Sequence, residues 1–595
     1  MTRLHARTGL ALWSNPYAGR YRSVPPLLRR SSSSTAGTPF QPDPRWPAWK
    51  PTVGLELHVQ LKGNPKLFSP ETAVYDDPPN THVAPFDAAL PGALPILQPA
   101  AVRLALLACL AFKADINPHS TFDRKHYFYP DLTTGFQITQ KYAPLAMNGL
   151  VRVKTPRQKK PKSSHQHKLE SDFFQVRLEQ IQLEQDTAKS FHDPSLPHGG
   201  GTLVDLNRAG AALVEIVTKP DMRSPEEAAA FVKTLQAILR HVGASGANME
   251  KGELRCDVNV SVAKINAHGQ VEQEGTRCEV KNLNGVRFIA GAVESEIRRQ
   301  IADLERGIPI EQATRGFDAV SHSTFHLRSK ESSPDYRYMP DPELGPVRLC
   351  AQALRELERE LPELPAEAEE RLAKEYGLGK RECEVLVALG EGAEETTAAV
   401  EAEADVEMEP GIGVRWFEQV AQGRDPKKAA NWLIHTLLGL LSRSGYTLST
   451  SPISANELGA LIDAVTSRRM TGTEAKTLLA DFSSSASSRL STANGSYQTF
   501  ETTLSKLLES RPAAESASSR DPAAPASAVT ASDDSLAALV ADVIASHPDE
   551  VAKIRKGQLK VVKRLVGESM KRSRGRADAK KVEELLLERL TGAES

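Results

Sequence analysis

The sequence has few cysteines, and their spacing is informative. Five cysteines occur among 595 residues, and no Cys-x-x-Cys pair is present. They are Cys109, Cys256, Cys278, Cys350 and Cys383. This scatter excludes the usual zinc-finger and disulfide-framework patterns, and it fits a protein of a reducing compartment.

Two further absences narrow the class of protein. No uncharged apolar stretch reaches ~18 residues, the length needed to cross a bilayer, and the nearest one, 100–112, contains Arg103. We therefore expect no membrane insertion. The sequence also lacks a Gly-x-x-x-x-Gly-Lys-Ser/Thr loop. An ATP site would therefore have to be built from strands and a metal ion rather than from a P-loop.

Acidic residues are absent from the first 40 positions. This segment contains arginines at positions 3, 7, 20, 22, 29 and 30 and a serine run at Ser31–Ser34. Such a composition is typical of a mitochondrial transit peptide, which is removed and does not contribute to the fold. A disordered basic leader without a targeting role is the alternative interpretation.

Net charge gives no global sign of a nucleic-acid partner, because it is -1 with a pI near 7.0. A local basic stretch does occur from Lys553 to Lys581, where apolar residues recur at helical spacing. Such a helix is suited to phosphate backbones, and a solvated charged helix is an equally simple interpretation. The candidate tRNA-binding residues within it are Lys560, Lys563, Arg564, Lys571, Arg572 and Arg574.

The clearest strand pattern runs from Val53 to Leu61. Apolar residues alternate with Glu56, His58 and Gln60, which is the period of a strand with one buried face. The segments 255–262 and 277–283 show the same alternation and predict a hairpin, with Asp257, Asn259, Glu279 and Lys281 on polar faces. Asp and Asn are disfavoured in strands, so their presence there favours a functional site.

Helical patterns and composition predict the rest of the organisation. Helices are expected at 99–112, after the N-cap residue Ser224, and at 288–304. We expect an α+β domain with a largely antiparallel sheet at 50–347 and a helical bundle at 348–482 with an acidic insertion at 390–409. A low-complexity linker at 483–534 and a small helical tail domain at 535–595 complete the prediction.

The polar segments of the first domain suggest phosphoryl-transfer chemistry. Carboxylates at close range raise one another's pKa unless a cation lies between them, and oxygen-rich ligands favour Mg²⁺ or Mn²⁺ over zinc. A lysine beside them suits a phosphate or a carboxylate that is being activated. Each residue alone also has a simple structural explanation on a solvated face. Their concentration in one region favours a site.

Several long motifs resemble one known family. They include Val-Gly-Leu-Glu-Leu-His-Val-Gln-Leu, Phe-Asp-Arg-Lys-His-Tyr-Phe-Tyr-Pro-Asp, Leu-Arg-Cys-Asp-Val-Asn-Val-Ser-Val and Asp-Tyr-Arg-Tyr-Met-Pro-Asp. In these segments, from Val53 to about Val347, the chain resembles the B subunit of the glutamyl-tRNA(Gln)/aspartyl-tRNA(Asn) amidotransferases, in its mitochondrial form. The resemblance implies a cradle-like catalytic domain, a helical domain and a small tail domain that contacts tRNA.

The resemblance also implies an activity, cofactors and partners. Members use ATP to activate the side-chain carboxylate of glutamate on tRNA(Gln), and ammonia then gives glutaminyl-tRNA in the mitochondrial matrix. An amidase-type glutaminase, the A subunit, would release the ammonia from glutamine, and a small C-type assembly subunit is also implied. The cofactors would be ATP and Mg²⁺.

Carried over by motif, the site residues fall into three groups. The catalytic candidates are Lys125, Asp257 and Glu279; the ATP- or substrate-binding candidates are Gln60, Asn259, Lys281, Arg328 and Arg337; the metal-binding candidates are Glu56, His58, Glu184 and Glu215. Gln185 and Ser69 depart from the family pattern, where relatives carry a second glutamate and a zinc-cluster cysteine. Zinc is therefore not expected.

Two other functions compete with this interpretation. One is a non-catalytic tRNA-binding or assembly protein that keeps the fold, and the retained carboxylates argue against it. The other is an ATP-dependent ligase acting on a free amino acid. The basic tail argues against the second, since a free amino acid needs no such surface.

Overall fold

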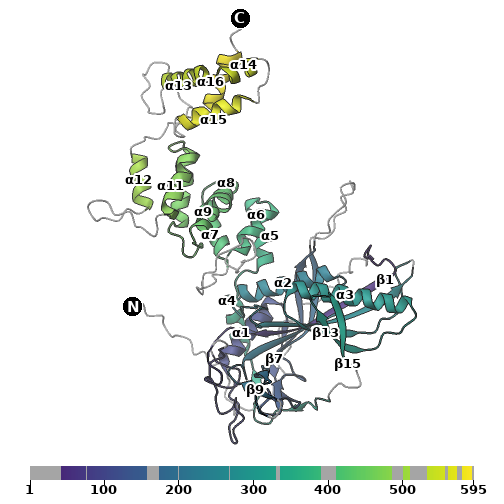
Figure 1. The fold of residues 1–595 in the computed structure, drawn as a ribbon. Helices are drawn as coiled ribbons and strands as arrows, with labels where there is room; N and C mark the ends of the chain where they lie inside the picture. Colours follow the sequence, from purple (N-terminus) through teal and green to yellow (C-terminus); the bar gives the residue numbers. More distant parts are fainter. Residues whose placement is uncertain are drawn as a thin grey trace. The chain divides into compact units, whose positions relative to one another are not determined.

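A computed structural model describes most of the chain (Figure 1). The described residues are 42–63, 65–74, 77–156, 173–197, 200–266, 268–329, 335–389, 411–484, 500–509, 533–555, 561–572 and 579–591. The chain divides into two compact units, Met1–Ala366 and Glu367–Ser595. The predicted transit peptide, the acidic insertion 390–409 and most of the basic segment 154–168 lie outside the described residues.

A large sheet forms the centre of the first unit. It has ten strands in the order β15-β14-β13-β11-β1-β10-β7-β6-β2, with β12 paired to β11 outside this path. Every pairing is antiparallel except that of β13 with β14, so the predicted α+β class with a largely antiparallel sheet is confirmed. The strands are β1 (Trp49–Gln60), β2 (Asp115–Ile116), β6 (Ala146–Lys154), β7 (Phe173–Gln185), β10 (Ala212–Thr218), β11 (Leu254–Ile265), β12 (Val271–Gln273), β13 (Cys278–Leu283), β14 (Ala313–Asp318) and β15 (Ser323–Ser329).

Helices cover one face of this sheet. They are α1 (Pro99–Ala111), α2 (Pro225–His241), α3 (Val286–Glu305) and α4 (Ala351–Glu360). Their apolar side chains form a single core with the inward residues of the strands, and α2 lies beside α3 (Figure 1). Leu357 of α4 and the following Leu364 also belong to this core, so the first unit runs to Ala366, beyond residue 347.

Local sequence explains where α2 begins. The side chain of Ser224 accepts a hydrogen bond from the backbone N–H of Glu227, and Pro225 occupies the first helical position. A capping oxygen satisfies one of the free N–H groups at a helix start, and proline is tolerated there because its missing N–H would have no helical partner. The helix start that the sequence predicts is therefore confirmed.

Three smaller sheets accompany the large one among the described residues. β4 (Asp123–His126) lies between β16 (Met339–Pro340) and β5 (Phe136–Thr139). The strands β3 (His119–Ser120) and β17 (Val347–Arg348) form a second pair, and β8 (Lys189–Asp193) and β9 (Gly201–Asp205) form a hairpin. The three-stranded sheet brings the Lys-His-Tyr-Phe-Tyr and Asp-Tyr-Arg-Tyr-Met segments together.

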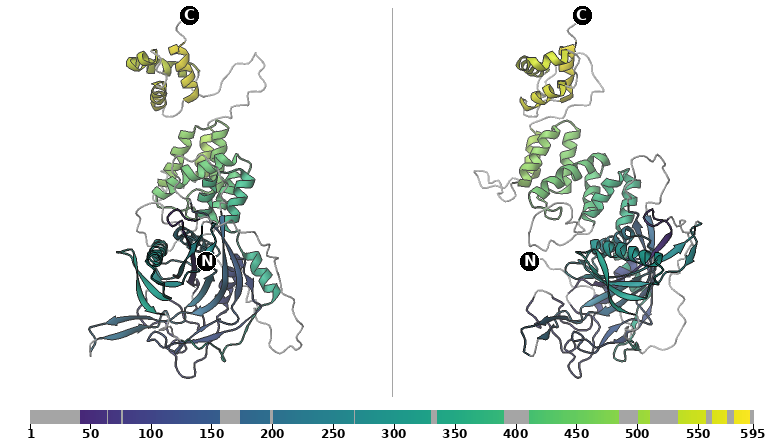
Figure 2. Two further views of the ribbon diagram at one scale, coloured as in Figure 1. Left: turned by 90° about the vertical axis from the view of Figure 1, so that its right-hand side faces the viewer. Right: turned by 45° about the vertical axis from the view of Figure 1, so that its right-hand side comes forward.

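The described residues of the second unit form helices around two hydrophobic cores (Figure 2). The first core uses α5 (Pro365–Tyr376), α6 (Lys380–Ala388), α7 (Ile412–Ala421), α8 (Pro426–Trp432), a π-helical turn (Leu433–Leu437), α9 (Leu438–Arg443), α10 (Ala455–Thr466), α11 (Gly472–Ser484) and α12 (Phe500–Glu509). The second uses α13 (Asp533–Ser546), α14 (Pro548–Arg555), α15 (Val562–Arg572) and α16 (Ala579–Thr591). Helix α12 falls within the stretch 483–534, for which composition predicted a low-complexity linker.

None of the helices in the described part of the chain combines the length and the apolarity that crossing a bilayer requires.

Candidate active site

Strand β1 supplies the first site residues because its two faces differ. Its burial alternates residue by residue, with Leu57 and Val59 inside the core and Glu56, His58 and Gln60 on the opposite face. This alternation follows from the period of a strand. His58 Nε2 lies 3.5 Å from a carboxylate oxygen of Glu56. The amide oxygen of Gln60 is buried, and it has no hydrogen-bond partner among the described residues.

The neighbouring strands bring two further carboxylates to His58. Glu215 of β10 is directly opposite His58, and Gln182 of β7 is directly opposite Glu215. Glu184 lies two residues further along β7, on the same face. Ligand atoms of His58, Glu184 and Glu215 all lie within 4.8 Å of one another. Among the described residues these three are the group whose geometry fits a bound cation.

The pKa values of the two glutamates at this point are shifted in opposite directions. The pKa of Glu215 lies well above its ordinary value, because the side chain is buried and Glu184 is negatively charged. Burial would also raise the pKa of Glu184, but the positive charge of Lys125 and the contacts with Glu215 and His58 together outweigh it and keep that pKa below the ordinary value. The two carboxyl groups therefore differ in how readily they ionise, Glu184 more readily than Glu215.

Lys125 faces this pair from β4. Its Nζ atom lies 3.9 Å from a carboxylate oxygen of Glu184, and it also lies over the rings of Tyr336, at 5.0 Å, and Tyr127, at 6.0 Å. Burial alone would lower the pKa of Lys125, but the negative charges around it, with that of Glu184 the largest, together outweigh burial and raise it. The lysine therefore stays charged in a largely enclosed position.

Glu56 is ionised for a different reason. The hydrogen bond with His58 lowers the pKa of Glu56 to about 2, against the burial that would raise it. On the other side of β1, Asp257 of β11 is directly opposite Glu56. Lys281 of β13 donates a hydrogen bond to Asp257 at 2.8 Å and lies 3.3 Å from Glu279. A line of charged groups thus crosses the sheet from β7 to β13.

The remaining sheet residues extend this line toward the edge strand. Asn259 is opposite Glu279, and Glu279 is opposite Thr314 of β14. The hydroxyl of Thr314 donates a hydrogen bond to Glu279 at 3.1 Å. Nε of Arg328 lies 3.5 Å from the same hydroxyl. The structure therefore brings Asn259, Lys281 and Arg328 onto the same polar face as the cluster.

Arg337 is the candidate that the structure places furthest from these contacts. Its side chain is 82% exposed, and its guanidinium lies 3.6 Å from Asp335. The segment around Arg337 contacts the site through its backbone, since the carbonyl of Arg337 accepts a hydrogen bond from His126. Among the described contacts, its guanidinium does not reach the carboxylates.

The tail residues are distributed over α15 and the positions next to it. Lys563, Arg564 and Lys571 are exposed on α15. Arg572, at the end of that helix, is paired with Asp542 of α13 at 2.5 Å. Lys560 and Arg574 lie outside the described residues. The exposed side of this helix therefore carries at least three basic side chains.

Sequence reasoning missed several residues that complete the cluster. Gln182 donates a hydrogen bond to Glu215 at 2.5 Å, and its amide also contacts the hydroxyl of Thr139. Tyr127, Tyr336 and Tyr338 surround the lysines, with Lys141 over the Tyr338 ring at 5.5 Å. The alternating tyrosines of the two aromatic motifs were the available signal, because rings beside a lysine favour a shared site.

Comparison with known proteins assigns this architecture to a family. Residues 51–355 match the model described as the GatB/GatE catalytic domain, and residues 415–495 and 525–590 match the GatB domain. The first model spans the strands that carry the site, and the second spans part of the first helical core and the whole second one. The chain therefore belongs to the GatB/GatE family.

Individual relatives are similar over nearly the whole chain. The mitochondrial glutamyl-tRNA(Gln) amidotransferase B subunit of Laccaria bicolor is 42% identical over 96% of this chain and 97% of its own length. The protein of the same name from Mycosarcoma maydis is 41% identical over 94% of this chain and 89% of its own length. The aspartyl/glutamyl-tRNA(Asn/Gln) amidotransferase B subunit of Methylobacterium nodulans is 40% identical over 91% of this chain and 96% of its own length. The resemblance that the motifs indicate is confirmed.

Proposed function

We propose that the chain is the subunit of a mitochondrial tRNA-dependent amidotransferase that activates glutamate on tRNA(Gln). ATP would phosphorylate the side-chain carboxylate of the glutamyl group, and ammonia would displace the phosphate to form Gln-tRNA(Gln). The observation that carries this proposal is the meeting of His58, Glu184 and Glu215 within 4.8 Å, with Lys125 at 3.9 Å from Glu184. Relatives that are named as B subunits of amidotransferases support this choice of reaction.

The donor set of this cluster fits a divalent cation such as Mg²⁺. Two buried carboxylates and an imidazole converge there, and one lysine offsets their negative charge only in part. His58, Glu184 and Glu215 would hold the ion, with Glu56 next to them through His58. When bound, the ion would neutralise charge on the transferred phosphoryl group and hold the phosphates in place.

The side chains around the cluster would then have separate tasks. Lys125 keeps its positive charge and is oriented by Tyr127 and Tyr336, so it would bind the substrate carboxylate or the phosphate that forms on it. Asp257 and Glu279 both contact Lys281, so this lysine is held in place for the phosphates of ATP. Gln60, Asn259 and Arg328 are the further candidates for orienting ATP or the acceptor end of the tRNA.

Ammonia would come from another polypeptide of the complex. Four of the five cysteines are buried, and burial raises the pKa of the Cys109, Cys256 and Cys278 thiols, which makes them poor nucleophiles. Cys350 is exposed, and its sulfur caps the first turn of α4. We therefore propose an amidase-type glutaminase partner, the A subunit, which hydrolyses glutamine, together with a small C-type assembly subunit. The Arg-rich segment 1–40 would act as the transit peptide to the matrix.

The helical tail would bind the tRNA. Lys563, Arg564 and Lys571 are exposed on one helix, which suits contacts to phosphates. Changing Lys563 and Lys571 together to alanine should weaken tRNA binding and flatten its salt dependence, by ~0.9 in the log–log slope for each phosphate that is no longer neutralised. Filter binding at several salt concentrations measures this slope. An unchanged slope would remove the tail from the proposed tRNA site.

One reaction tests the proposed function directly. The chain, alone and with its candidate partner subunits, is incubated with Glu-tRNA(Gln), ATP, Mg²⁺ and ammonium chloride in the absence of glutamine. Formation of Gln-tRNA(Gln) that requires ATP is the expected result, because free ammonia bypasses the glutaminase. Binding of tRNA without product, even in the assembled complex, would instead favour a non-catalytic scaffold.

A further inference from the structure

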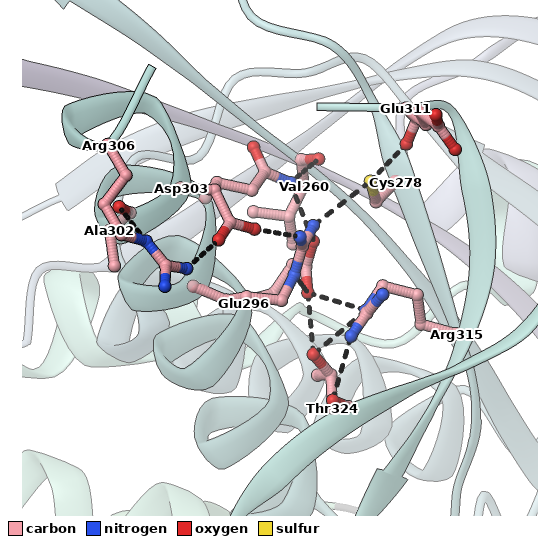
Figure 3. Close-up of polar contacts among 11 residues, drawn as sticks. Val260, Cys278, Glu296, Ala302, Asp303, Arg306, Glu311, Arg315 and Thr324 are labelled. Carbon is pink, nitrogen blue, oxygen red and sulfur yellow. Dashed lines mark hydrogen bonds and ion pairs between the residues drawn. The ribbon is translucent and has the colours of Figure 1, made fainter. Parts of the chain in front are cut away.

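The two outermost strands of the large sheet direct their side chains to opposite faces. Arg315 of β14 and Thr324 of β15 both contact Glu296 of α3, so they face the helices (Figure 3). Phe317 does the same, since a β-carbon on Gly291 of α3 would lie 3.0 Å from its ring. By the alternation of a strand, Gly316 and Phe325 face the other way, toward the polar side that carries the candidate active site.

Phe325 is placed on that polar side by a glycine. Gly316 and Phe325 are directly opposite in the pairing of β14 with β15. A β-carbon on Gly316 would lie only 2.9 Å from two carbons of the Phe325 ring, so the ring occupies the space that a side chain would need. The Phe325 side chain nevertheless stays half exposed, at 49%. An aromatic ring is thus held over the strand, with part of its surface open to solvent.

A row of polar groups leads from this ring to the proposed cation site. Thr314 lies two residues from Gly316 on the same face and is linked to both Arg328 and Glu279. Lys281 and Asp257 continue the row toward Glu56. Arg328 has no carboxylate within ion-pair distance among the described residues, so its charge is available to a ligand.

We infer that Phe325 is the stacking surface for the adenine ring of ATP, with the triphosphate extending past Arg328 toward Glu56 and His58. The inference rests on the proposed function. Three strand spacings of ~4.8 Å separate β14 from β1, or about 14 Å, which suits an extended nucleotide. Aromatic side chains stack on bases irrespective of sequence, and an arginine nearby favours phosphate.

The charges along the row favour ATP over the acceptor end of the tRNA as the occupant. Glu279, Asp257 and Glu56 are carboxylates that would repel a phosphodiester backbone. A nucleoside triphosphate binds together with divalent cations, and these convert such carboxylates into partners. The row therefore fits a metal-bound triphosphate.

Steady-state kinetics of the assembled complex test the inference. Phe325→Ala should raise the KM for ATP about tenfold, as loss of one stacked base predicts, while kcat and the KM for Glu-tRNA(Gln) stay unchanged. Phe325→Trp should keep the KM near that of the wild type. Leu327→Ala is the matched control, since Leu327 is a similarly exposed apolar residue, at 47%, on the same strand, and it should leave all constants unchanged.

A second variant reaches the same ring without altering it. Gly316→Ala puts a methyl group where the ring lies, so it should also raise the KM for ATP, and combining it with Phe325→Ala should add nothing further. An unchanged KM for ATP in Phe325→Ala, or a rise in the KM for the tRNA instead, would overturn the inference. Absence of ATP-dependent product in the wild-type complex would overturn the proposed function as well.

Discussion

Two buried carboxylate clusters lie on opposite faces of the same sheet, and their partners differ sharply. On the helical face, Glu296 of α3 is fully buried and is bound by Arg299 and Gln300. Arg315 and Thr324 also contact it (Figure 3). On the polar face, Lys125 lies 3.9 Å from Glu184, the hydroxyl of Thr139 donates a hydrogen bond to Glu184, and Gln182 donates one to Glu215. On the polar face two carboxylates therefore have one lysine as cationic partner, whereas on the helical face the single carboxylate of Glu296 has two arginines.

The difference separates a structural cluster from a functional one. Burial would raise the pKa of Glu296, but the hydrogen bonds and charge of Arg299 outweigh it, and its carboxylate stays ionised with its oxygens satisfied. At Glu215, burial and the negative charge of Glu184 dominate, and they raise its pKa. A buried site with excess negative charge is unfavourable unless a ligand completes it. The comparison therefore assigns stability to the first cluster and ligand binding to the second.

The largest effect should come from the functional cluster. Glu184→Gln removes a proposed cation ligand and the charge that holds Lys125, so ATP-dependent formation of Gln-tRNA(Gln) should fall by about 100-fold or more. Thermal unfolding should change little, because the lost contact with Lys125 is offset by relief of the repulsion between Glu184 and Glu215. Turnover at the wild-type rate would contradict the assignment of this cluster.

Unfolding measurements should show the opposite ranking. Glu296→Gln leaves Arg315 and Arg299 without their buried carboxylate, so it should lower the free energy of unfolding by about 3 kcal/mol. Glu215→Gln removes a carboxyl group whose charge is disfavoured by burial and by Glu184, so it should be neutral or stabilising without metal. Denaturant unfolding of both variants compares them. An equal loss in both would mean that the two clusters do not differ in this way.

The two clusters should also give stability opposite dependences on pH. The pKa of Glu296 is lowered, so its contribution is present above the unfolded pKa, about 4.3, and is lost as pH falls through the lower folded pKa. The pKa of Glu215 is raised, so without metal its contribution falls as pH increases from that unfolded pKa toward the higher folded one. For each variant, Glu296→Gln and Glu215→Gln, the melting temperature is measured between about pH 3.5 and about pH 7 and subtracted from that of the wild type. Plotted against pH, the two differences should have slopes of opposite sign. Slopes of the same sign would refute this difference.

The smallest effect belongs to an exposed ion pair on the same helix as Glu296. Glu294 pairs with Arg298 one turn away, and both side chains are solvent-accessible. Glu294→Gln should therefore cost only about 0.3–0.5 kcal/mol. It is the surface control for Glu296→Gln, and the loss should disappear at high salt. A loss as large as that of Glu296→Gln would show that burial does not set the magnitude.

The sequence was sufficient to predict features that depend on local pattern. The alternation in β1, the cap of α2 and the antiparallel pairing of β11 with β13 each follow from a period or a single residue. Local pattern could not predict the positions of two other residues. Thr139 reaches the glutamates from a separate small sheet, and Glu296 lies on an amphipathic helix where a glutamate would normally face water. Both depend on contacts between distant segments, which no local pattern encodes.

The alternation of β1 has a consequence for how this protein can evolve. Core residues and site residues follow one another along the same strand, so one inserted or deleted codon within it would exchange the two sets. Such a change would bury Glu56 and His58 against α2 and α3 and expose Leu57 and Val59. This strand can therefore change by substitution but not by insertion or deletion. A descendant that keeps the chemistry must keep these twelve residues in the same register.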